Sequence, residues 1–386
     1  MKYDASPQAV SASRRAFLRG AVGMVSATSF SSSGLALSAS AIRPTDKTIV
    51  VTFGGGARDE ETFAEEGQAN IPNLLHTLLP QGTFFTQVRN AGILGHYVAT
   101  ASIVTGVYER FNNFIAQPPP NPTLFEYFRR ELRRPETDAW VIAPSNGFQK
   151  IGSSSAGGFG PQFGAGVILP KRLLSAASRN TPLFDNDQLQ HFLQDNYEMP
   201  SYDIAATAQD HEMQLDTLES TLRLSVQDFV KHARTLDSAD ELSIFIARRL
   251  MDQQAPSLMM LTLHDMDVAH SGAFSLYIDA IQRADRLCAE LWKAVQSHPE
   301  YKDRTTVYIM PDFGRDADDD PAGNGFQHHR TGSAMARTTW LLALGPHVRQ
   351  NTVVDRAIES IDLVPTIGCH LGFSTNSPGR CIEELR

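Results

Sequence analysis

Acidic and imidazole side chains gather in two short segments in the C-terminal half of the sequence. In chain order they are His264, Asp265, Asp267, His270, Asp312, Arg315, His328 and His329. The first group follows the apolar run 258–263 and the second follows 305–310, and both runs predict buried strands. Carboxylate and imidazole ligands without thiolates suit zinc, manganese or iron better than an iron–sulfur centre. We therefore predict a divalent metal site, zinc being favoured, where these two strands end.

The spacing narrows the choice of ligands. His270 has two candidate partners in its own loop, Asp267 and Asp265, and the alternative to metal binding is a hydrogen-bonded structural pair. Asp312 directly follows a strand, where an unpaired carboxylate is costly to bury. We expect it to be a ligand, with an ion pair to Arg315 as the alternative. Because adjacent histidines usually point apart, either His328 or His329 should bind the metal, and we favour His329.

The elements that must position these residues alternate between strands and helices. Strands are expected at 48–53, 83–88, 139–143, 258–263, 305–310 and 340–344, and helices at 71–79, 97–104, 203–234, 238–251 and 274–297. This alternation predicts an α/β fold with a doubly wound, mainly parallel sheet that is covered by helices on both faces. Ligands bind such sheets at the carboxyl ends of the strands.

The middle of the chain differs in composition from the rest. Residues 145–182 are rich in Gly and Ser and predict loop or lid material, and the charged helical stretches follow. We expect one domain over 42–386 that carries an inserted lid or cap at about 145–256.

The N-terminus carries an export signal. Ser13-Arg14-Arg15-Ala16-Phe17-Leu18-Arg19 is a twin-arginine motif, and the mildly apolar stretch after it is too interrupted to predict a permanent membrane anchor. Ala39-Ser40-Ala41 fits a cleavage site, so 1–41 would be a signal peptide. The expected partner is the twin-arginine export machinery, and the expected location is the bacterial periplasm or the medium.

Charge and cysteine content limit the partners further. Removing 1–41 takes away four basic residues and one acid, which changes the formal net charge from −9 to −12. Nucleic acid is therefore not an expected partner, although one cleft could still receive a small anionic substrate. Cys369 and Cys381 could form a disulfide in an oxidising compartment, whereas Cys288 is expected to pack inside a helix. The oligomeric state does not follow from the sequence.

Several motifs resemble the alkaline phosphatase superfamily, which includes sulfatases and nucleotide phosphodiesterases. They are the closing pattern 361–368 with Leu371-Gly372-Phe373, the turn Pro311-Asp312-Phe313-Gly314, the Asp265 or Asp267 pair with His270, and Ser102-Ile103-Val104-Thr105-Gly106. The resemblance spans about 48–373 and implies a metal-dependent hydrolase of phosphate or sulfate esters.

The sequence departs from the superfamily pattern at three positions. Gly54 stands where the first strand normally ends in an aspartate ligand, His96 falls at the nucleophile position, and Phe313 replaces a histidine ligand. His96 could be a ligand, a general base or nucleophile, or a packed polar residue at a helix start that could hold an anion. Thr100 is the best hydroxyl nucleophile if one exists.

Three further residues could complete the site. Asp59 could replace the missing ligand across the glycines 54–56, and Arg58 or Arg315 could bind the anionic group as a bidentate donor. The rival hypothesis is a degenerate relative that serves as a periplasmic binding or assembly protein. A third hypothesis is an isomerase or phosphotransferase, because cofactor-independent phosphoglycerate mutases share the fold.

Overall fold

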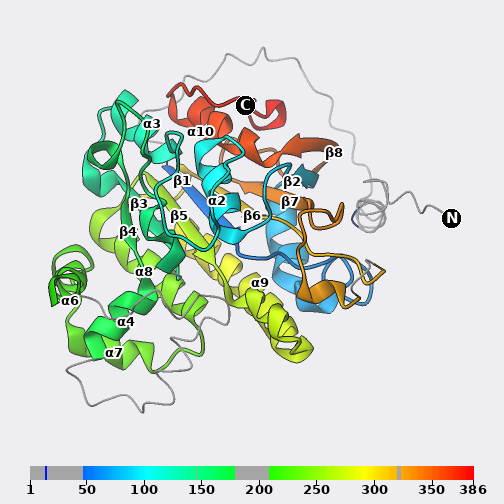
Figure 1. Cartoon of the computed structure of the whole chain (residues 1–386), viewed down its shortest axis with the longest axis horizontal. Coiled ribbons are helices and arrows are strands. Elements are labelled where there is room, and N and C mark those ends of the chain that lie inside the picture. Colours follow the sequence, from blue (N-terminus) through cyan, green and yellow to red (C-terminus); the bar gives the residue numbers. More distant parts are fainter. Residues whose placement is uncertain (1–13, 15–46, 145, 179–207, 320–322) are drawn as a thin grey trace.

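The computed structural model describes residue 14 and residues 47–144, 146–178, 208–319 and 323–386. These residues form a single eight-stranded sheet with helices on both faces (Figure 1). The twin-arginine motif, except Arg14, and the expected cleavage site lie outside the described residues.

The sheet has the strand order β4-β3-β5-β1-β6-β7-β2-β8. Its strands are β1 (Lys47–Phe53), β2 (Gly82–Arg89), β3 (Ala139–Ile142), β4 (Gly166–Ile168), β5 (Leu258–Leu263), β6 (Thr305–Pro311), β7 (Thr338–Leu344) and β8 (Thr352–Glu359). Among these described strands, β7 alone runs antiparallel to its neighbours, β6 and β2. The sheet is therefore mainly parallel, as the alternation of strands and helices predicted.

Apolar residues on the strands alternate between two cores. Ile49 and Val51 of β1 belong to one buried cluster, and Val50 between them belongs to the other. The same alternation separates Met259 from Met260 on β5. A strand that is apolar on both faces is the mark of a sheet buried between two helical layers.

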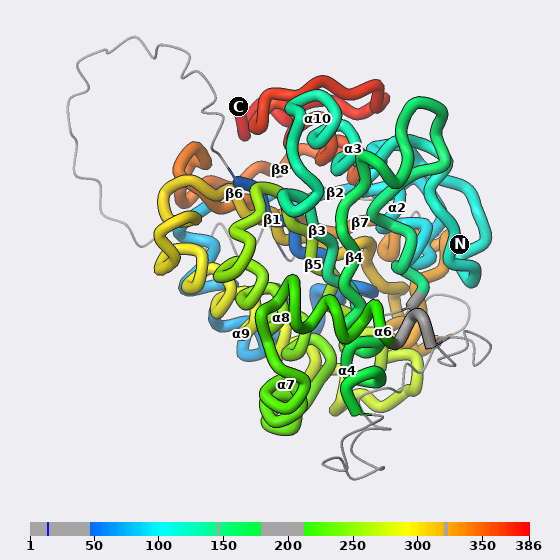
Figure 2. The backbone as a smooth tube through the Cα atoms, turned by 90° about the vertical axis from the view of Figure 1, so that its left-hand side faces the viewer, coloured from blue at the N-terminus to red at the C-terminus, as the bar shows by residue number. Residues whose placement is uncertain are grey.

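The helices divide between these layers. They are α2 (His96–Thr105), α3 (Leu124–Glu131), α4 (Pro170–Ser178), α6 (Ala208–Asp216), α7 (Val226–Ala233), α8 (Ala239–Gln254), α9 (Phe274–Ser297) and α10 (Leu363–Leu371). Buried residues of α2, α3 and α10 form one core with the sheet, and those of α4, α7, α8 and α9 form the other. Figure 2 shows α3 and α10 above the sheet and α4, α7 and α8 below it.

The segment expected to be loop or lid is partly built into the fold. Within 145–182 the chain forms β4, which pairs in parallel with β3 at the edge of the sheet, and α4, which packs in the core. The loop prediction was wrong for these two elements. β4 has only three residues, which is too short for an apolar pattern to reveal it, and it is defined by its backbone pairing with β3.

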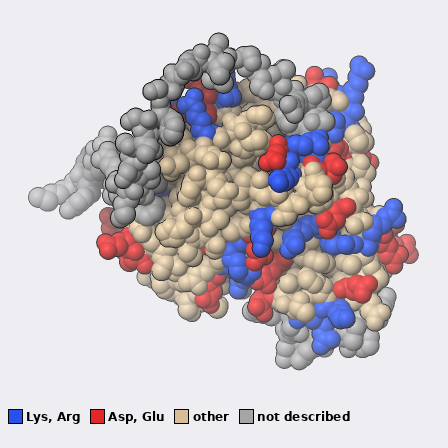
Figure 3. Space-filling view, turned by 180° about the vertical axis from the view of Figure 1, so that it is seen from behind, with Lys and Arg blue, Asp and Glu red and all other residues tan. Residues whose placement is uncertain are grey.

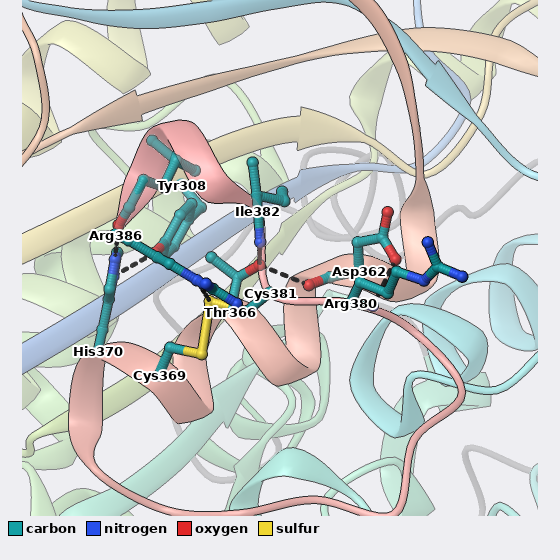
Figure 4. The surroundings of a disulfide bond; sticks show 10 residues. Tyr308, Asp362, Thr366, Cys369, His370, Arg380, Cys381, Ile382 and Arg386 are labelled. Atoms are coloured by element: carbon teal, nitrogen blue, oxygen red, sulfur yellow. Dashed lines mark hydrogen bonds between the residues drawn. A yellow bond between two sulfur atoms is a disulfide. The ribbon is translucent and has the colours of Figure 1, made fainter.

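The C-terminal segment is fastened to the sheet by several contacts (Figure 4). A disulfide joins Cys369 on α10 to Cys381, twelve residues later. Tyr308 on β6 shares a hydrogen bond of 2.6 Å with His370, whose other ring nitrogen contacts the carbonyl oxygen of Leu385. Cys288 is free and buried in α9. Both expectations about the cysteines are confirmed.

The surface and the helices add two observations. On the face shown in Figure 3, basic and acidic side chains are intermingled rather than gathered into one basic patch. No helix within the described ranges combines the length and the apolar character that a membrane crossing requires.

Candidate metal centre

The site lies at the carboxyl ends of three central strands, β1, β5 and β6, which end side by side. Phe53, the last residue of β1, pairs with Leu263 of β5 on one side and with Pro311 of β6 on the other. The next residues, Gly54, His264 and Asp312, therefore emerge side by side. After His264 the chain forms a short 3-10 helix, η8 (Asp265–Ser271), which carries Asp267 and His270.

Four side chains converge near these strand ends. His96, Asp267, His270 and His329 each offer a ligand atom, and these atoms lie within 4.8 Å of one another. Oδ1 of Asp267 is 3.1 Å from Nε2 of His96 and 3.1 Å from Nε2 of His270. Nε2 of His270 is 2.7 Å from Nε2 of His329. His96 enters as the first residue of α2, and His329 follows the 3-10 turn Gly325–Gln327.

The outer nitrogens of two of these histidines are held by further groups. Nδ1 of His96 is 2.8 Å from Oδ2 of Asp312, and Nδ1 of His329 is 3.0 Å from the carbonyl oxygen of Leu94. The other oxygen of Asp312 accepts the backbone N–H groups of Gly55 and Phe313 at 3.0 and 2.9 Å. Partners of this kind orient the metal-ligating histidines of proteins and fix their tautomers.

Electrostatic interactions favour the protonation states in which two cluster residues, Asp267 and His329, can bind a metal. Burial works against the charge on Asp267, but His96 and His270 hold the pKa of this carboxyl well below its usual range. Burial, reinforced by the charge on His96, lowers the pKa of His329 well below that of an ordinary histidine. An ionised carboxylate and a neutral imidazole are the forms that bind metal.

His96 is the exception. Burial opposes its charge, yet Asp267 and Asp312 raise the pKa of His96 to about 10. Without a metal, the imidazolium neutralises the two carboxylates between which it lies. A metal ion would have to displace this proton, so metal uptake at neutral pH would release it.

The donor set fits a zinc ion. Three imidazole nitrogens and one carboxylate oxygen are ligands that zinc takes, and they would complete a tetrahedral shell. Zinc–nitrogen distances of about 2.0–2.1 Å give ligand atoms about 3.3 Å apart in that geometry. Three observed separations, 2.7, 3.1 and 3.1 Å, are shorter than this value, and the four ligand atoms all lie within 4.8 Å of one another. The side chains would therefore have to rearrange around a bound ion to form the shell.

The position beside Gly54 is filled by protein atoms. A Cβ atom on residue 54 would lie only 1.8 Å from Cδ2 of His264, so the ring of His264 occupies the space that a side chain there would need. Phe313 is fully buried and stacks on His96 with ring centroids 4.9 Å apart. The three departures seen in the sequence thus meet in one place, where an imidazole and a phenyl ring are packed.

Several predicted site residues lie outside the cluster. Asp265 pairs with Arg283 at 3.1 Å, and Asp312 contacts the cluster through His96. His328 is not a member of the group although its neighbour His329 is. Asp59 accepts a hydrogen bond of 2.7 Å from Arg14, the first arginine of the twin pair.

Three residues predicted to bind an anion or to act as nucleophile, Arg58, Arg315 and Thr100, do not belong to the cluster. Arg58 is held by Glu61 at 3.0 Å and Asp318 at 2.6 Å. Arg315 is fully buried, donates to the carbonyl oxygen of Met266 at 3.0 Å and lies 3.5 Å from Oδ1 of Asp267. Thr100 is buried inside α2 and does not line the cleft described next.

A cleft of about 550 Å³ opens above the cluster, and its walls include residues that the sequence reasoning missed. Lys171 of α4 is one. Asn113 is another, and its side-chain oxygen accepts the backbone N–H groups of Tyr97 and Val98 at 3.1 and 3.4 Å. The start of α2, expected to hold an anion, is therefore capped by this side chain. Neither residue belongs to a recognisable motif, so no sequence signal pointed to them.

Comparison with known proteins gives matches of structure only. No protein-family model matches the chain, and no curated protein matches its sequence at a significant level. The phosphonate monoester hydrolase of Silicibacter pomeroyi superposes with a TM-score of 0.54 at 13% identity, over 87% of this chain and 76% of that one. The lipoteichoic acid synthase LtaP of Listeria monocytogenes gives 0.51 at 12% identity, over 89% and 76%.

A third solved structure comes from a protein that is described as a member of a superfamily. A protein in the alkaline phosphatase superfamily from Vibrio parahaemolyticus superposes with a TM-score of 0.50 at 14% identity, over 87% of this chain and 69% of that one. These structural matches agree with the resemblance seen in the sequence. This protein therefore has the fold of the alkaline phosphatase superfamily.

Proposed function

We propose that the protein is a metal-dependent hydrolase of phosphate or sulfate esters. The observation that carries the proposal is the convergence of His96, Asp267, His270 and His329 at the carboxyl ends of the central strands. Solved structures with this fold include a phosphonate monoester hydrolase. A ligand-rich cluster under an open cleft is the arrangement expected of a catalytic metal centre.

The proposed metal is one zinc ion, with manganese or iron as alternatives. When bound, zinc would polarise an ester oxygen and lower the pKa of water. Asp267, His270 and His329 would supply ligands from two loops, and His96 would supply a fourth from the start of α2. To take a water or an ester oxygen as well, the zinc would have to expand to five ligands, as catalytic zinc sites can do. Asp312 keeps Nε2 of His96 directed at the cluster by accepting from its Nδ1.

In this proposal the attacking group is water. An imidazole, His96, stands at the nucleophile position, and the candidate hydroxyl of Thr100 does not line the cleft. His264, whose pKa burial and the nearby His96 lower to about 3, stays neutral and can donate one N–H to a substrate oxygen. The buried Lys171 lends positive charge to the same cleft.

Export from the cytoplasm completes the proposal. The motif Ser13–Arg19 supports transport by the twin-arginine route, and the Cys369–Cys381 disulfide suits an oxidising compartment. We therefore assign the mature protein to the periplasm or the medium, where it would meet small anionic esters.

A matched pair of adjacent histidines tests the metal site. The protein purified without chelators should hold about one equivalent of zinc, manganese or iron by elemental analysis. His329→Ala should lower this content at least tenfold, because it removes a ligand. His328→Ala, which changes the neighbouring residue outside the cluster, should keep it. A folded protein that holds no metal, or equal metal loss in both variants, would overturn the assignment.

Activity separates the proposal from its rival, a non-catalytic binding or assembly protein. The packing of His264 over Gly54 and of Phe313 on His96 is the observation that favours the rival. The metal-loaded protein should hydrolyse at least one of a phosphomonoester, a phosphodiester and a sulfate ester, and His270→Ala should abolish that turnover. Metal content without turnover on any of the three would favour the rival.

A further inference from the structure

The walls of the cleft indicate what kind of ester it receives. Three large apolar side chains that line it are exposed to solvent: Ile93 by 37%, Phe114 by 56% and Leu276 by 51%. We call these three residues the apolar rim. They come from three separate segments, the loop before α2, the loop after it and the start of α9, so their meeting at one cleft does not follow from a local sequence pattern.

Exposed apolar residues are common on protein surfaces, but they are usually scattered. Within the described ranges, the large hydrophobic residues with similar exposure are Ile93, Phe114, Ile115, Met213, Phe274, Leu276 and Val353. Three of these seven line the cleft above the cluster, and Ile115 and Phe274 are close in sequence to two of them. Such a concentration beside a polar cluster points to an apolar ligand group.

The inner part of the cleft suits the anionic end of the same ligand. Of the described residues that line it, Lys171 and Arg283 are the lysine and arginine side chains, and Asp265 holds Arg283 at 3.1 Å. Lys171 is buried. The buried Nε2 atom of His264 has no hydrogen-bond partner among the described residues. A buried polar atom without a partner is costly unless a ligand or water meets it.

We propose that the cleft binds an anionic ester of an apolar alcohol, with the anionic group between the histidine–aspartate cluster, Lys171 and His264 and the apolar group on the rim of Ile93, Phe114 and Leu276. This substrate class rests on the proposed function. It also predicts that lengthening the apolar group strengthens binding, whereas the anionic group fixes its orientation.

Binding of inert phosphonates tests the inference without any turnover. Methylphosphonate and phenylphosphonate have the same charged head and differ only in the apolar group. Calorimetric titration of the metal-loaded protein should show that phenylphosphonate binds about tenfold more tightly, the gain expected from partial burial of one phenyl ring. Inorganic phosphate should displace both ligands, which ties them to the same site.

Variants of the rim provide the decisive comparison. The double change Phe114→Ser with Leu276→Ser should remove most of the tenfold preference and leave the affinity for methylphosphonate unchanged. Val353→Ser, which changes an exposed apolar residue on β8 outside the cleft, should leave the preference intact. Equal affinity of the wild-type protein for both phosphonates, or an unchanged preference in the double variant, would overturn the inference.

Lys171 is tested with the same ligands. Lys171→Met should weaken both phosphonates by a similar factor of about ten, so the ratio between them persists, and Lys171→Arg should restore most of the loss. Unaltered phosphonate affinity in Lys171→Met would remove this residue from the site. A protein that shows the predicted binding but hydrolyses no ester would refute the proposed function alone. Ester turnover without a preference for apolar alcohols would refute the inference alone.

Discussion

His96 is the residue on which the candidate site depends most. One ring nitrogen belongs to the cluster and the other meets Asp312, so the residue connects the metal ligands to the end of β6. The sequence could identify Asp312 as a strand-end carboxylate next to a site. The sequence could not distinguish a carboxylate that binds the metal directly from one that orients a ligating histidine, because both roles use the same residue type at the same position after a strand.

This arrangement predicts the effect of Asp312→Asn. The amide oxygen can still accept the N–H groups of Gly55 and Phe313, so the amide nitrogen would face Nδ1 of His96. His96 would then have to accept at Nδ1 and carry its proton at Nε2, the wrong tautomer for a ligand. We expect metal affinity to fall about 10- to 100-fold, measured by competition with a chromophoric chelator.

A carboxylate in the same cleft serves as the control for that experiment. Asp279 is exposed and lines the cleft but does not belong to the cluster. Asp279→Asn should therefore leave metal affinity within about twofold of the wild-type value. If Asp312→Asn binds metal as tightly as Asp279→Asn does, Asp312 does not orient His96.

At the scale of elements, the site is shaped by how closely β1 and β5 approach each other at their ends. Gly54 and His264 follow paired residues of these two strands, and the imidazole takes the space over the glycine. A larger residue at 54 and the present position of His264 exclude each other.

Gly54→Ala should destabilise the metal-free protein by about 1–3 kcal/mol, because the new methyl group overpacks the contact with His264. Adding His264→Ala should recover much of this loss, which appears as a favourable coupling energy in a double-mutant cycle of urea unfolding. Gly157→Ala is the matched control, since a Cβ atom there meets nothing within 4 Å. Additive effects at 54 and 264 would contradict the steric account.

The elements that could be predicted are those with strong periodicity. The amphipathic pattern gave α9 with both ends at the expected residues, and the buried apolar runs gave β1, β5 and β6. β4 and α4 were missed because they are short and lie in a stretch whose overall Gly and Ser content resembles loop composition. β8 was missed because its residues are largely exposed and polar, so it is recognisable only from its pairing with β2. Lys171 was not predicted as a site residue because it lies on α4, which was itself missed.

At the scale of the whole molecule, the described residues form a continuous sheet between two large cores, and the candidate site lies at the carboxyl ends of its central strands. The core formed by α2, α3 and α10 also includes Ile382 and Leu385 from the last residues of the chain. The disulfide ties this terminal segment to α10, and neither cysteine lines the cleft. Stability and site chemistry should therefore respond separately when the disulfide is removed.

The double change Cys369→Ser with Cys381→Ser opens a loop closed across twelve residues. The chain-entropy relation for a loop of this size gives a loss of about 3 kcal/mol in the free energy of unfolding, measurable by denaturant titration. Metal content should stay at the wild-type level, because three of the four cluster residues, Asp267, His270 and His329, lie in the segments after β5 and β6, outside the disulfide-closed loop. A reductant should lower the stability of the wild-type protein and leave the double variant unchanged. A wild-type protein insensitive to reductant would show that the disulfide adds no stability, and metal loss in the double variant would show that the terminal segment supports the cluster.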